Sequence, residues 1–538
     1  MNLLKLSDIY KNDSANRTNI GGLFFCAACF LIFPLIIHNY SDTTMWKIQT
    51  FTAILSVSAV LCIASALIDK SFARKDILKS PTLWFILAYA AVCVISVLLS
   101  PYSSSVNSSG QTIGIFGSGR TDGLLYILMY LLALLIPALF CGFRKSFAYL
   151  LAVAGGINAV MTVLQLFGLN IFGLIPGAPL QYVFIQFAGT FGNVDFLSAF
   201  LCFCACFIGG YYIISDDGKQ RYILPIAFAL IIYTELSIGV SSGLIGLIAA
   251  AGATLPLFLS HCDKLPRIAN LLIALLAGIL PSTVISHTYA SNRTTNSFTF
   301  GTGFFIVLAL LIFAVAARIL LVSIKPKYKR KTAIIVLYSV EAVLLVAAIL
   351  IIKFAFSGKS GLLGEISALL NGNISPMAGS HRIAIWQYTL KMFEDKPWLG
   401  VGTGSFSRAF SNSVLAEYQQ VIGKNTLPDA AHNEYLQQLA TVGIIGFAAY
   451  MGWFLSIFIR GFKYALKNPK LTVCLCAAAG FAAQMSFNIN IIIIAPYFYI
   501  ILGITEYEIL STKRAAANPP VSDKPQVSEK IPKNDITV

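Results

Sequence analysis

Apolar runs of roughly 20 residues alternate with short polar gaps along most of this 538-residue chain. A run of about 20 apolar residues is long enough to cross a hydrocarbon core as a helix. Within lipid, a helix also satisfies every backbone polar group internally. The pattern therefore predicts an all-α polytopic membrane protein with about fourteen transmembrane helices. The expected spans are 20–39, 47–68, 80–100, 123–141, 146–167, 193–214, 222–238, 243–260, 268–287, 301–324, 333–353, 435–459, 471–487 and 491–510.

The positive charges give these helices an orientation. If the N-terminus lies inside, 27 of the 38 Lys and Arg residues fall in inside segments or in the two termini. Cytoplasmic loops carry the excess of Lys and Arg, so both termini are expected in the cytoplasm. The net charge of +15 is then mostly topological. It favours contact with anionic lipid headgroups and gives no support to nucleic-acid binding.

Four parts of the chain follow from this topology. Residues 1–353 form about eleven N-terminal helices, and residues 433–510 form about three more. The segment 354–432 is a large extracytoplasmic loop, much longer than an ordinary connection, and its Trp, Phe, Leu and Ile content argues against disorder. Residues 511–538 are Pro-rich and charged, which is typical of a disordered cytoplasmic tail.

Two further features concern the cysteines and the N-terminus. The 11 cysteines lie in apolar runs or in inside gaps, so we expect buried thiols rather than disulfides. The N-terminus lacks a small-residue cleavage pattern, so the first helix is expected to be retained.

Polar side chains gather where the chain enters the membrane after the long loop. Asp429, His432, Asn433 and Gln437 lie close together there, and Asp429 is expected to cap the helix. At 1.5 Å per residue, His432 lies about 12 Å above the hydrocarbon portion of that helix, near headgroup depth. A lone histidine is more often an interfacial anchor or a cap. Its polar neighbours favour a functional role here.

An amphipathic helix is expected earlier in the long loop, with Ser380 as its N-cap. Its apolar positions recur at three- and four-residue steps and form a stripe suited to the bilayer interface. The stripe comprises Ile383, Trp386, Leu390 and Phe393. Arg382 falls near the helix N-terminus, where the dipole disfavours a cation. It is either a solvated surface arginine or a clamp for an anion such as phosphate. Pro397 then ends the helix, and Gly400, Gly402 and Gly404 predict a tight turn.

Other polar residues lie at or within the expected spans. Arg120 and Asp122, in GSGRTDG, form either an internal ion pair or, through Arg120, a second anion contact. Asn193 and Asp195, in GTFGNVD, lie at the outer mouth of a helix. Charged residues inside membrane spans are candidates for a functional role, although polar contacts between packed helices explain them equally well. These groups are Glu235, Arg318 and Glu341. No clustered oxygen ligands suggest a metal site.

These motifs resemble the bacterial O-antigen ligase and O-antigen polymerase family. The family pattern of His, then Asn, Ser or Gln, nine residues and Gly-x-x-Gly matches at His432, Asn433, Gly443 and Gly446. The family's upstream pattern, Arg-x-x-x-Trp followed by Pro-x-x-Gly-x-Gly-x-Gly-x-Phe, also matches. Its matching residues are Arg382, Trp386, Pro397, Gly400, Gly402, Gly404 and Phe406. The earlier GRTDGLL and GTFGNVD segments resemble the family more loosely.

The chain departs from the family at two places. The family often has an arginine before the GTFGN segment and Asn-Pro-Asn within it, whereas this chain reads QFAGTFGNVD, with Asp195 at the last Asn position. A Ser-Arg-Gly common in relatives is Ser241-Ser242-Gly243 here. Arginine contacts made at those positions in relatives do not carry over, and Arg120 is a candidate replacement for one of them.

The resemblance implies a glycosyltransferase in the bacterial cytoplasmic (inner) membrane, with its active site on the extracytoplasmic side. The donor would be a glycan on undecaprenyl diphosphate. Arg382, with Arg120, would hold the diphosphate. His432 would act as general base for an acceptor hydroxyl. The further substrate-binding candidates are Asn433, Gln437, Asp429, Trp386, Asn193 and Asp195.

No metal, nucleotide or other cofactor is expected for this chemistry, because the diphosphate lipid is already activated. The acceptor is left open between a glycan or lipid, as for a polymerase or ligase, and a protein hydroxyl, as for an O-oligosaccharyltransferase. The chain could instead belong to a different functional class, as a transporter of an anion or a lipid-linked sugar. Glu235, Arg318 and Glu341 would then line the transport path.

Overall fold

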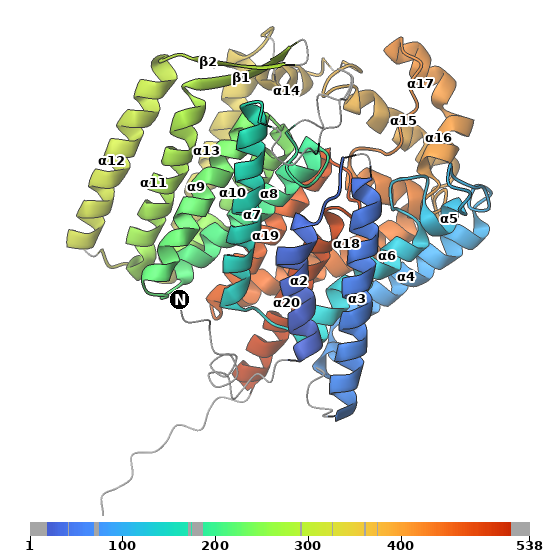
Figure 1. The fold of residues 1–538 in the computed structure, drawn as a ribbon, viewed down its shortest axis with the longest axis horizontal. Helices are drawn as coiled ribbons and strands as arrows, with labels where there is room; N and C mark the ends of the chain where they lie inside the picture. Colours follow the sequence, from blue (N-terminus) through green and yellow to red (C-terminus); the bar gives the residue numbers. More distant parts are fainter. Residues whose placement is uncertain are drawn as a thin grey trace, which may run out of the picture.

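The computed structural model describes residues 19–40, 42–68, 75–169, 174, 187–290, 293–324, 326–359, 362–373 and 375–517. Most of the polar N-terminal start and residues 518–538 of the expected tail lie outside this range. In the described chain a helix stands at each of the fourteen expected places (Figure 1). These helices are α2 (Ile20–Leu35), α3 (Thr43–Ile68), α4 (Pro81–Leu99), α6 (Leu124–Phe140), α7 (Lys145–Leu166), α8 (Val194–Ile214), α9 (Ile223–Ile238), α10 (Ser241–Leu259), α11 (Leu265–Ser282), α12 (Thr302–Ile324), α13 (Arg330–Ala355), α18 (Glu434–Ala465), α19 (Pro469–Gln484) and α20 (Ala495–Ala517).

Most of these helices have the length and composition of membrane spans. Within the described residues, ten helices are long and apolar enough to cross a membrane. Another three, α2, α6 and α9, are apolar but shorter. The predicted class, a mostly helical polytopic membrane protein, is therefore confirmed. The number of fourteen crossings stays a prediction.

Two helix ends differ from the expectation. α11 ends at Ser282, and the chain then forms an antiparallel hairpin of β1 (Ile285–Ala290) and β2 (Arg293–Phe298), with Ile285 opposite Phe298. The helix expected to continue to residue 287 was wrong there, because this Ser- and Thr-rich segment pairs with the segment that follows it. At the other end of the chain, α20 continues to Ala517, past the expected start of the tail.

Shorter helical segments fill several connections. They are η2 (Lys75–Lys79), α5 (Ile113–Phe116), η4 (Lys219–Tyr222), η5 (Cys262–Lys264) and η6 (Met485–Phe487), together with α14 (Leu362–Leu370), α15 (Arg382–Asp395), α16 (Phe406–Ser413) and α17 (Leu415–Ile422) of the long loop. The hairpin and α14–α17 lie at the same end of the helix bundle (Figure 1). The hairpin and the long loop therefore share one side of the bundle.

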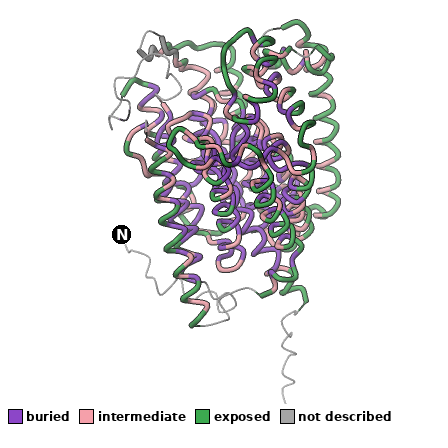
Figure 2. The backbone as a smooth tube through the Cα atoms, turned by 90° about the vertical axis from the view of Figure 1, so that its right-hand side faces the viewer, coloured by how far each residue is buried: buried purple, intermediate pink, exposed green. Residues whose placement is uncertain are grey.

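Burial is concentrated in the middle of the bundle (Figure 2). All but two residues of α8 are buried, and residues 495–510 of α20 are buried without a break. In contrast, α13 buries no residue and α12 buries only Ala314. All eleven cysteines lie in the described chain and are free, and ten of them are buried. α8 and α20 thus form the centre of the protein, and α12 and α13 lie at its edge.

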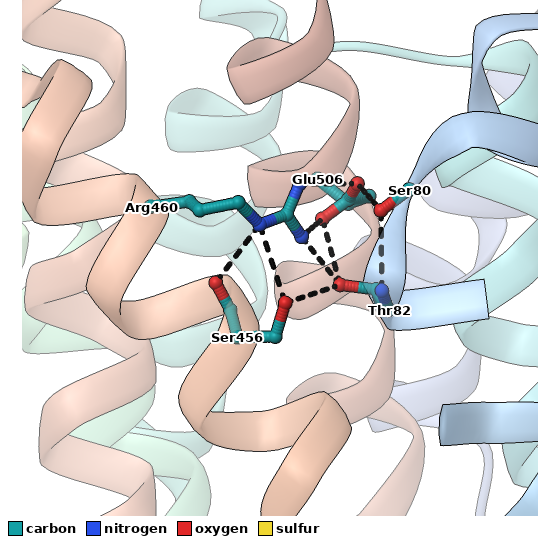
Figure 3. Close-up of polar contacts among 5 residues, drawn as sticks. All are labelled: Ser80, Thr82, Ser456, Arg460 and Glu506. Carbon is teal, nitrogen blue, oxygen red and sulfur yellow. Dashed lines mark hydrogen bonds and ion pairs between the residues drawn. The ribbon is translucent and has the colours of Figure 1, made fainter. Parts of the chain in front are cut away.

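A polar clamp ties α20 to two neighbouring helices (Figure 3). Glu506 of α20 accepts hydrogen bonds from Arg460 of α18, 3.0 Å from Nη1, and from Ser80, 2.7 Å away, at the start of α4. Thr82 also donates to Glu506, and Ser456 accepts from Thr82. Because the Glu506 side chain is fully buried, the arginine supplies the charge that the interior requires.

The long loop has its own hydrophobic core. α15 buries Ala384, Ile385, Thr389 and Met392. None of these four residues belongs to the predicted apolar stripe, so the stripe was assigned to the wrong face of the helix. Leu390, a member of the stripe, is 42% exposed. The helix packs against α16 and α17 as well as α18, so its covered face is set by these neighbours and not by the bilayer interface alone.

The glycine turn and α18 interlock. Gly400, Gly402 and Gly404 all adopt positive φ, as a tight turn requires. The backbone N–H of Gly402 donates to the carbonyl of Thr441 at 2.9 Å. α18 breaks its helical geometry at Gly443, where φ is 66° and ψ is −175°. This junction attaches the long loop to the bundle about two and a half turns beyond the first residue of α18.

Candidate active site

Asn433 sets the start of α18. Its side-chain oxygen accepts hydrogen bonds from the backbone N–H groups of Tyr435 at 3.0 Å and Leu436 at 3.1 Å. Asn433, and not Asp429, is therefore the N-cap, so the expected capping role of Asp429 was wrong. The helix begins later than that expectation required, which leaves the Asp429 carboxylate for another contact. His432, directly before the cap, adopts a positive φ of 49° that is uncommon for a non-glycine residue.

The peptide before His432 is held from both sides. The indole Nε1 of Trp386 donates to the carbonyl of Ala431 at 3.0 Å, and the N–H of Ala431 donates to Gln437 Oε1 at 2.9 Å. Gln437 in turn donates to Asp122 Oδ2 at 3.5 Å. The structure thus brings Trp386 and Gln437 to His432, and both hold the backbone of its neighbour. These two hydrogen bonds to Ala431 also support the uncommon backbone conformation at His432.

Arg120 pairs with Asp429 and not with Asp122. Its Nε donates to Asp429 Oδ2 at 2.7 Å, and its Nη2 contacts the same oxygen. The other oxygen, Oδ1, lies 3.8 Å from Nε2 of His432. The internal ion pair considered within GSGRTDG is replaced by one that spans 309 positions of the sequence. A carboxylate, an arginine and a histidine are thereby grouped at one place.

Arg382 is the first residue of α15. The N-cap position is His381 and not Ser380, and both residues have positive φ. Within the described chain, the Arg382 guanidinium has no hydrogen-bond or ion-pair partner. It acts electrostatically on His432 and on Asp195. The long loop therefore folds back on itself, so that the charge of Arg382 acts on His432. That the two residues serve one substrate stays a prediction.

The electrostatic surroundings keep His432 neutral. Burial is the largest of the effects that together lower the pKa of His432 to about 4; Asp429 opposes the shift, and Arg382 and Arg120 add to it. Burial raises the pKa of Asp122 to about 6, although Arg120 pulls it down. At neutral pH the histidine therefore has a lone pair available to accept a proton.

Asn193 and Asp195 lie at the N-terminus of α8. Asn193 caps the helix by accepting a hydrogen bond from the N–H of Asp195 at 2.7 Å. Asn488, just after η6, donates to the backbone carbonyl of Asp195 at 3.0 Å. The neighbouring Phe487 contacts the ring of Trp386 at 5.9 Å between centroids. Asp195 thus joins the site through Arg382, whereas the amide oxygen of Asn193 is used by the helix.

A narrow pocket, lined by polar and apolar side chains, lies beside these residues. It encloses about 480 Å³, counted with the part open to solvent. Its lining residues are Arg120, Asp122, Ile127, Tyr130, Ala430, Glu434, Gln437, Gln438, Thr441, Ile489, Asn490 and Tyr499. Two buried acceptor atoms among them, Oδ1 of Asp122 and Oδ1 of Asn490, have no partner among the described residues. The pocket can therefore bind groups that donate hydrogen bonds, such as water or hydroxyls.

Sequence reasoning missed Glu434, Gln438 and Asn490. Gln438 links Glu434 to Tyr89, because its Nε2 donates to Glu434 Oε1 at 2.8 Å and its Oε1 accepts from Tyr89 at 2.6 Å. A signal existed for two of them: Glu434 and Gln438 are four residues apart and so share a helix face with the start of α18. Asn490 gave no such signal, because it lies in a connection far along the chain.

The charged residues proposed for a transport path do not lie at this site. The three groups lie on separate helices: Glu235 accepts from Ser198 of α8, Arg318 donates to Asn270 of α11, and Glu341 lies on α13. None of them lines the pocket. Within the described residues no three His, Cys, Asp or Glu side chains are grouped so that they could hold a metal ion.

Comparison with known proteins agrees with the motifs. Residues 297–451 match the family described as O-Antigen ligase. This segment runs from the end of β2 through the long loop to the middle of α18, so it includes Arg382, Asp429 and His432. A comparison with curated proteins gives no match. The resemblance seen in the motifs is thereby confirmed, and it implies a membrane enzyme of the glycosyltransferase type.

Proposed function

We propose that this chain, whose residues 297–451 belong to the O-antigen ligase family, transfers a glycan from undecaprenyl diphosphate to an acceptor hydroxyl. The observation that carries the proposal is the convergence of Arg382, Arg120 and His432, which lie on three separate segments. These groups suit a reaction that needs an anion held and a proton removed. The reaction would take place at the outer membrane face, the side on which the charge distribution places the long loop.

The two arginines would hold the donor. A guanidinium presents paired N–H groups that match phosphate oxygens and keeps its charge at every physiological pH. The Arg382 guanidinium has no ion-pair partner in the described chain, so a diphosphate could bind it without breaking an internal pair. Charge accumulates on the diphosphate as its bond to the sugar breaks, and fixed positive groups stabilise that charge.

His432 would remove the proton. The acceptor oxygen attacks the anomeric carbon, the bond from that carbon to the diphosphate oxygen breaks, and the electron pair leaves with the diphosphate. The acceptor proton passes to the neutral imidazole, which its low pKa keeps deprotonated at neutral pH. The acceptor stays open between a glycan, a lipid and a protein hydroxyl, so the enzyme is a ligase, a polymerase or a protein O-oligosaccharyltransferase.

Purified protein in lipid nanodiscs tests this function directly. The substrates are an undecaprenyl-diphosphate glycan and a panel of glycan, lipid and peptide acceptors, and the measurement is release of undecaprenyl diphosphate together with the glycosylated product. His432→Ala and Arg382→Ala should each lower turnover by roughly 10²- to 10⁴-fold. Arg408→Ala is the matched control, because Arg408 is an exposed arginine of the same loop.

Two outcomes would contradict the proposal. Unchanged turnover in both His432→Ala and Arg382→Ala would overturn the assignment of the site. Movement of a lipid-linked sugar or anion across the membrane without any glycosyl transfer would overturn the class of activity.

A further inference from the structure

Asp429 lies between two groups that can both use its charge. Its Oδ2 accepts the hydrogen bond from Arg120, and its Oδ1 lies 3.8 Å from His432 Nε2. The second distance suits an ion pair but is too long for a hydrogen bond. The side chain is 42% exposed, so the carboxylate has room to move between the two partners.

The charges around His432 oppose its protonation. Arg120 approaches from the connection before α6, and Arg382 approaches from α15. Both guanidinium groups repel a positive imidazolium, whereas Asp429 attracts one. The remaining acidic groups lie farther back: Asp122 and Glu434 line the pocket, and Asp195 faces Arg382. The imidazole is therefore neutral, but its protonated form, which the reaction must produce, is poorly stabilised.

A diphosphate changes this balance of charge. It brings negative charge to Arg382 and Arg120, and it competes with Asp429 for the N–H groups of Arg120. A carboxylate released from Arg120 is already within ion-pair range of His432. Both effects act in the same direction, because they weaken the repulsion and strengthen the attraction felt by an imidazolium.

We propose that Asp429 exchanges partners during the reaction: the donor diphosphate takes Arg120 from it, and Asp429 then pairs with His432 and makes that histidine an effective base. The inference rests on the function proposed above. It makes Asp429 a positioning residue that couples donor binding to base strength. It also orders the reaction, because the acceptor is activated only after the donor is in place.

The exchange fixes which ring nitrogen takes the proton. Nε2 is the ring nitrogen near Asp429, so once Asp429 pairs with it, Nε2 carries the hydrogen and Nδ1 has the free lone pair. The acceptor hydroxyl gives its proton to Nδ1 as its oxygen bonds to the anomeric carbon. The bond from that carbon to the diphosphate breaks, and its electron pair stays with the diphosphate. The imidazolium that forms donates Nε2–H to Asp429.

Protonation of His432 can be measured apart from turnover. The protein, labelled with ¹⁵N-histidine and held in nanodiscs, is titrated with pH with and without undecaprenyl diphosphate, and His432→Gln assigns the signal among the five histidines. In the wild type, undecaprenyl diphosphate should raise the protonation constant of His432 about tenfold or more. In Asp429→Asn the increase should be clearly smaller. An equal increase in Asp429→Asn, or none in the wild type, would overturn the inference.

Kinetics give an independent test. Because Asp429→Asn removes the competitor for Arg120, the variant should bind undecaprenyl diphosphate roughly tenfold more tightly and yet lower kcat by roughly 10- to 100-fold. Loss of a merely structural residue would not tighten donor binding. Glu417→Gln is the control, because it removes an exposed ion pair with Lys391 in the same loop. Weaker donor binding or an unchanged kcat in Asp429→Asn would contradict the exchange.

Failure of this inference differs from failure of the proposed function. If undecaprenyl diphosphate binds the wild type but leaves the protonation of His432 unchanged, only the exchange is wrong. If undecaprenyl diphosphate does not bind the wild type at all, the proposed function and the exchange are wrong together.

Discussion

Replacing Gly443 by alanine should damage both stability and activity. Gly443 lies in α18 with a φ of 66° and a ψ of −175°, a conformation that is almost confined to glycine. A Cβ at this position would lie 2.3 Å from the carbonyl carbon of Trp398 and 2.5 Å from the backbone nitrogen of Leu399. Both atoms belong to the backbone of the turn that joins the long loop to α18. The turn must therefore move to make room.

The cost can be worked from these contacts. A side chain held in this backbone region costs about 1–3 kcal/mol. The displaced turn also weakens two hydrogen bonds, from Ile444 N–H to the carbonyl of Pro397 at 2.8 Å and from Ile445 N–H to that of Trp398 at 3.4 Å. Each such bond contributes about 1 kcal/mol. Gly443→Ala should therefore destabilise the protein by roughly 2–5 kcal/mol.

Thermal denaturation in detergent, followed by the fraction of protein that stays monodisperse, measures this loss. Gly252→Ala is the matched control, because Gly252 lies inside α10 with ordinary helical geometry, and a Cβ added there would meet no neighbouring atom within 4 Å. The control should be unchanged or more stable by up to about 1 kcal/mol, since alanine favours helices. Equal stability and equal turnover in the two variants would refute the argument for the α18 junction.

Three other predictions concern the polar clamp at Glu506, the indole of Trp386 and the dependence of stability on pH. Arg460→Met leaves the buried Glu506 without its counter-charge, and thermal unfolding should show a loss of about 3–5 kcal/mol that Glu506→Gln in the same chain partly restores. Trp386→Phe removes the hydrogen bond to Ala431 but keeps a ring, so kcat should fall about tenfold with an intact fold by circular dichroism. For His432, the unfolded chain binds the extra proton between pH 6.5 and about pH 4, so the stability due to the neutral ring is full above pH 6.5 and is lost as the pH falls to about 4. His432→Gln should flatten the dependence of the unfolding temperature on pH in that window.

Helix positions followed from the sequence because lipid leaves the backbone few choices. Each apolar run became a helix, and the described chain has one at every expected place. The hairpin at residues 285–298 was missed, since its Ser and Thr residues give no long apolar pattern and pair only with each other. Caps were harder to predict from one short segment: Asp429 and Ser380 lie close to helix starts and were expected as caps, but the N-cap residues are Asn433 and His381.

The partners of the candidate site were harder to predict. The sequence placed Arg120 two residues from Asp122, and that proximity suggested an ion pair between them. The structure instead joins Arg120 to Asp429 of the long loop, a residue 309 positions away in the sequence. Contacts between distant segments depend on how the helices pack, which hydrophobic patterning alone does not specify. A joint role for Arg382 and His432 was suggested by the family motifs and not by hydrophobic patterning, and the structure adds that the charge of Arg382 acts on His432.

The Arg120–Asp429 pair has a consequence for how this protein can be recombined. The segment that matches the O-antigen ligase family, residues 297–451, carries Arg382, Asp429 and His432 but not Arg120. Its glycine turn also fits closely against the connection between α4 and α6: a Cβ at Gly404 would lie 2.4 Å from the carbonyl oxygen of Ile113. A chimera that exchanges only residues 297–451 with a relative would therefore separate Asp429 from Arg120. It would also pack the glycine turn of one protein against the α4–α6 connection of the other. Residues 100–123 contact the long loop through Arg120 and the glycine turn, so grafts that move both segments together should be the ones that keep the substrate specificity of the relative.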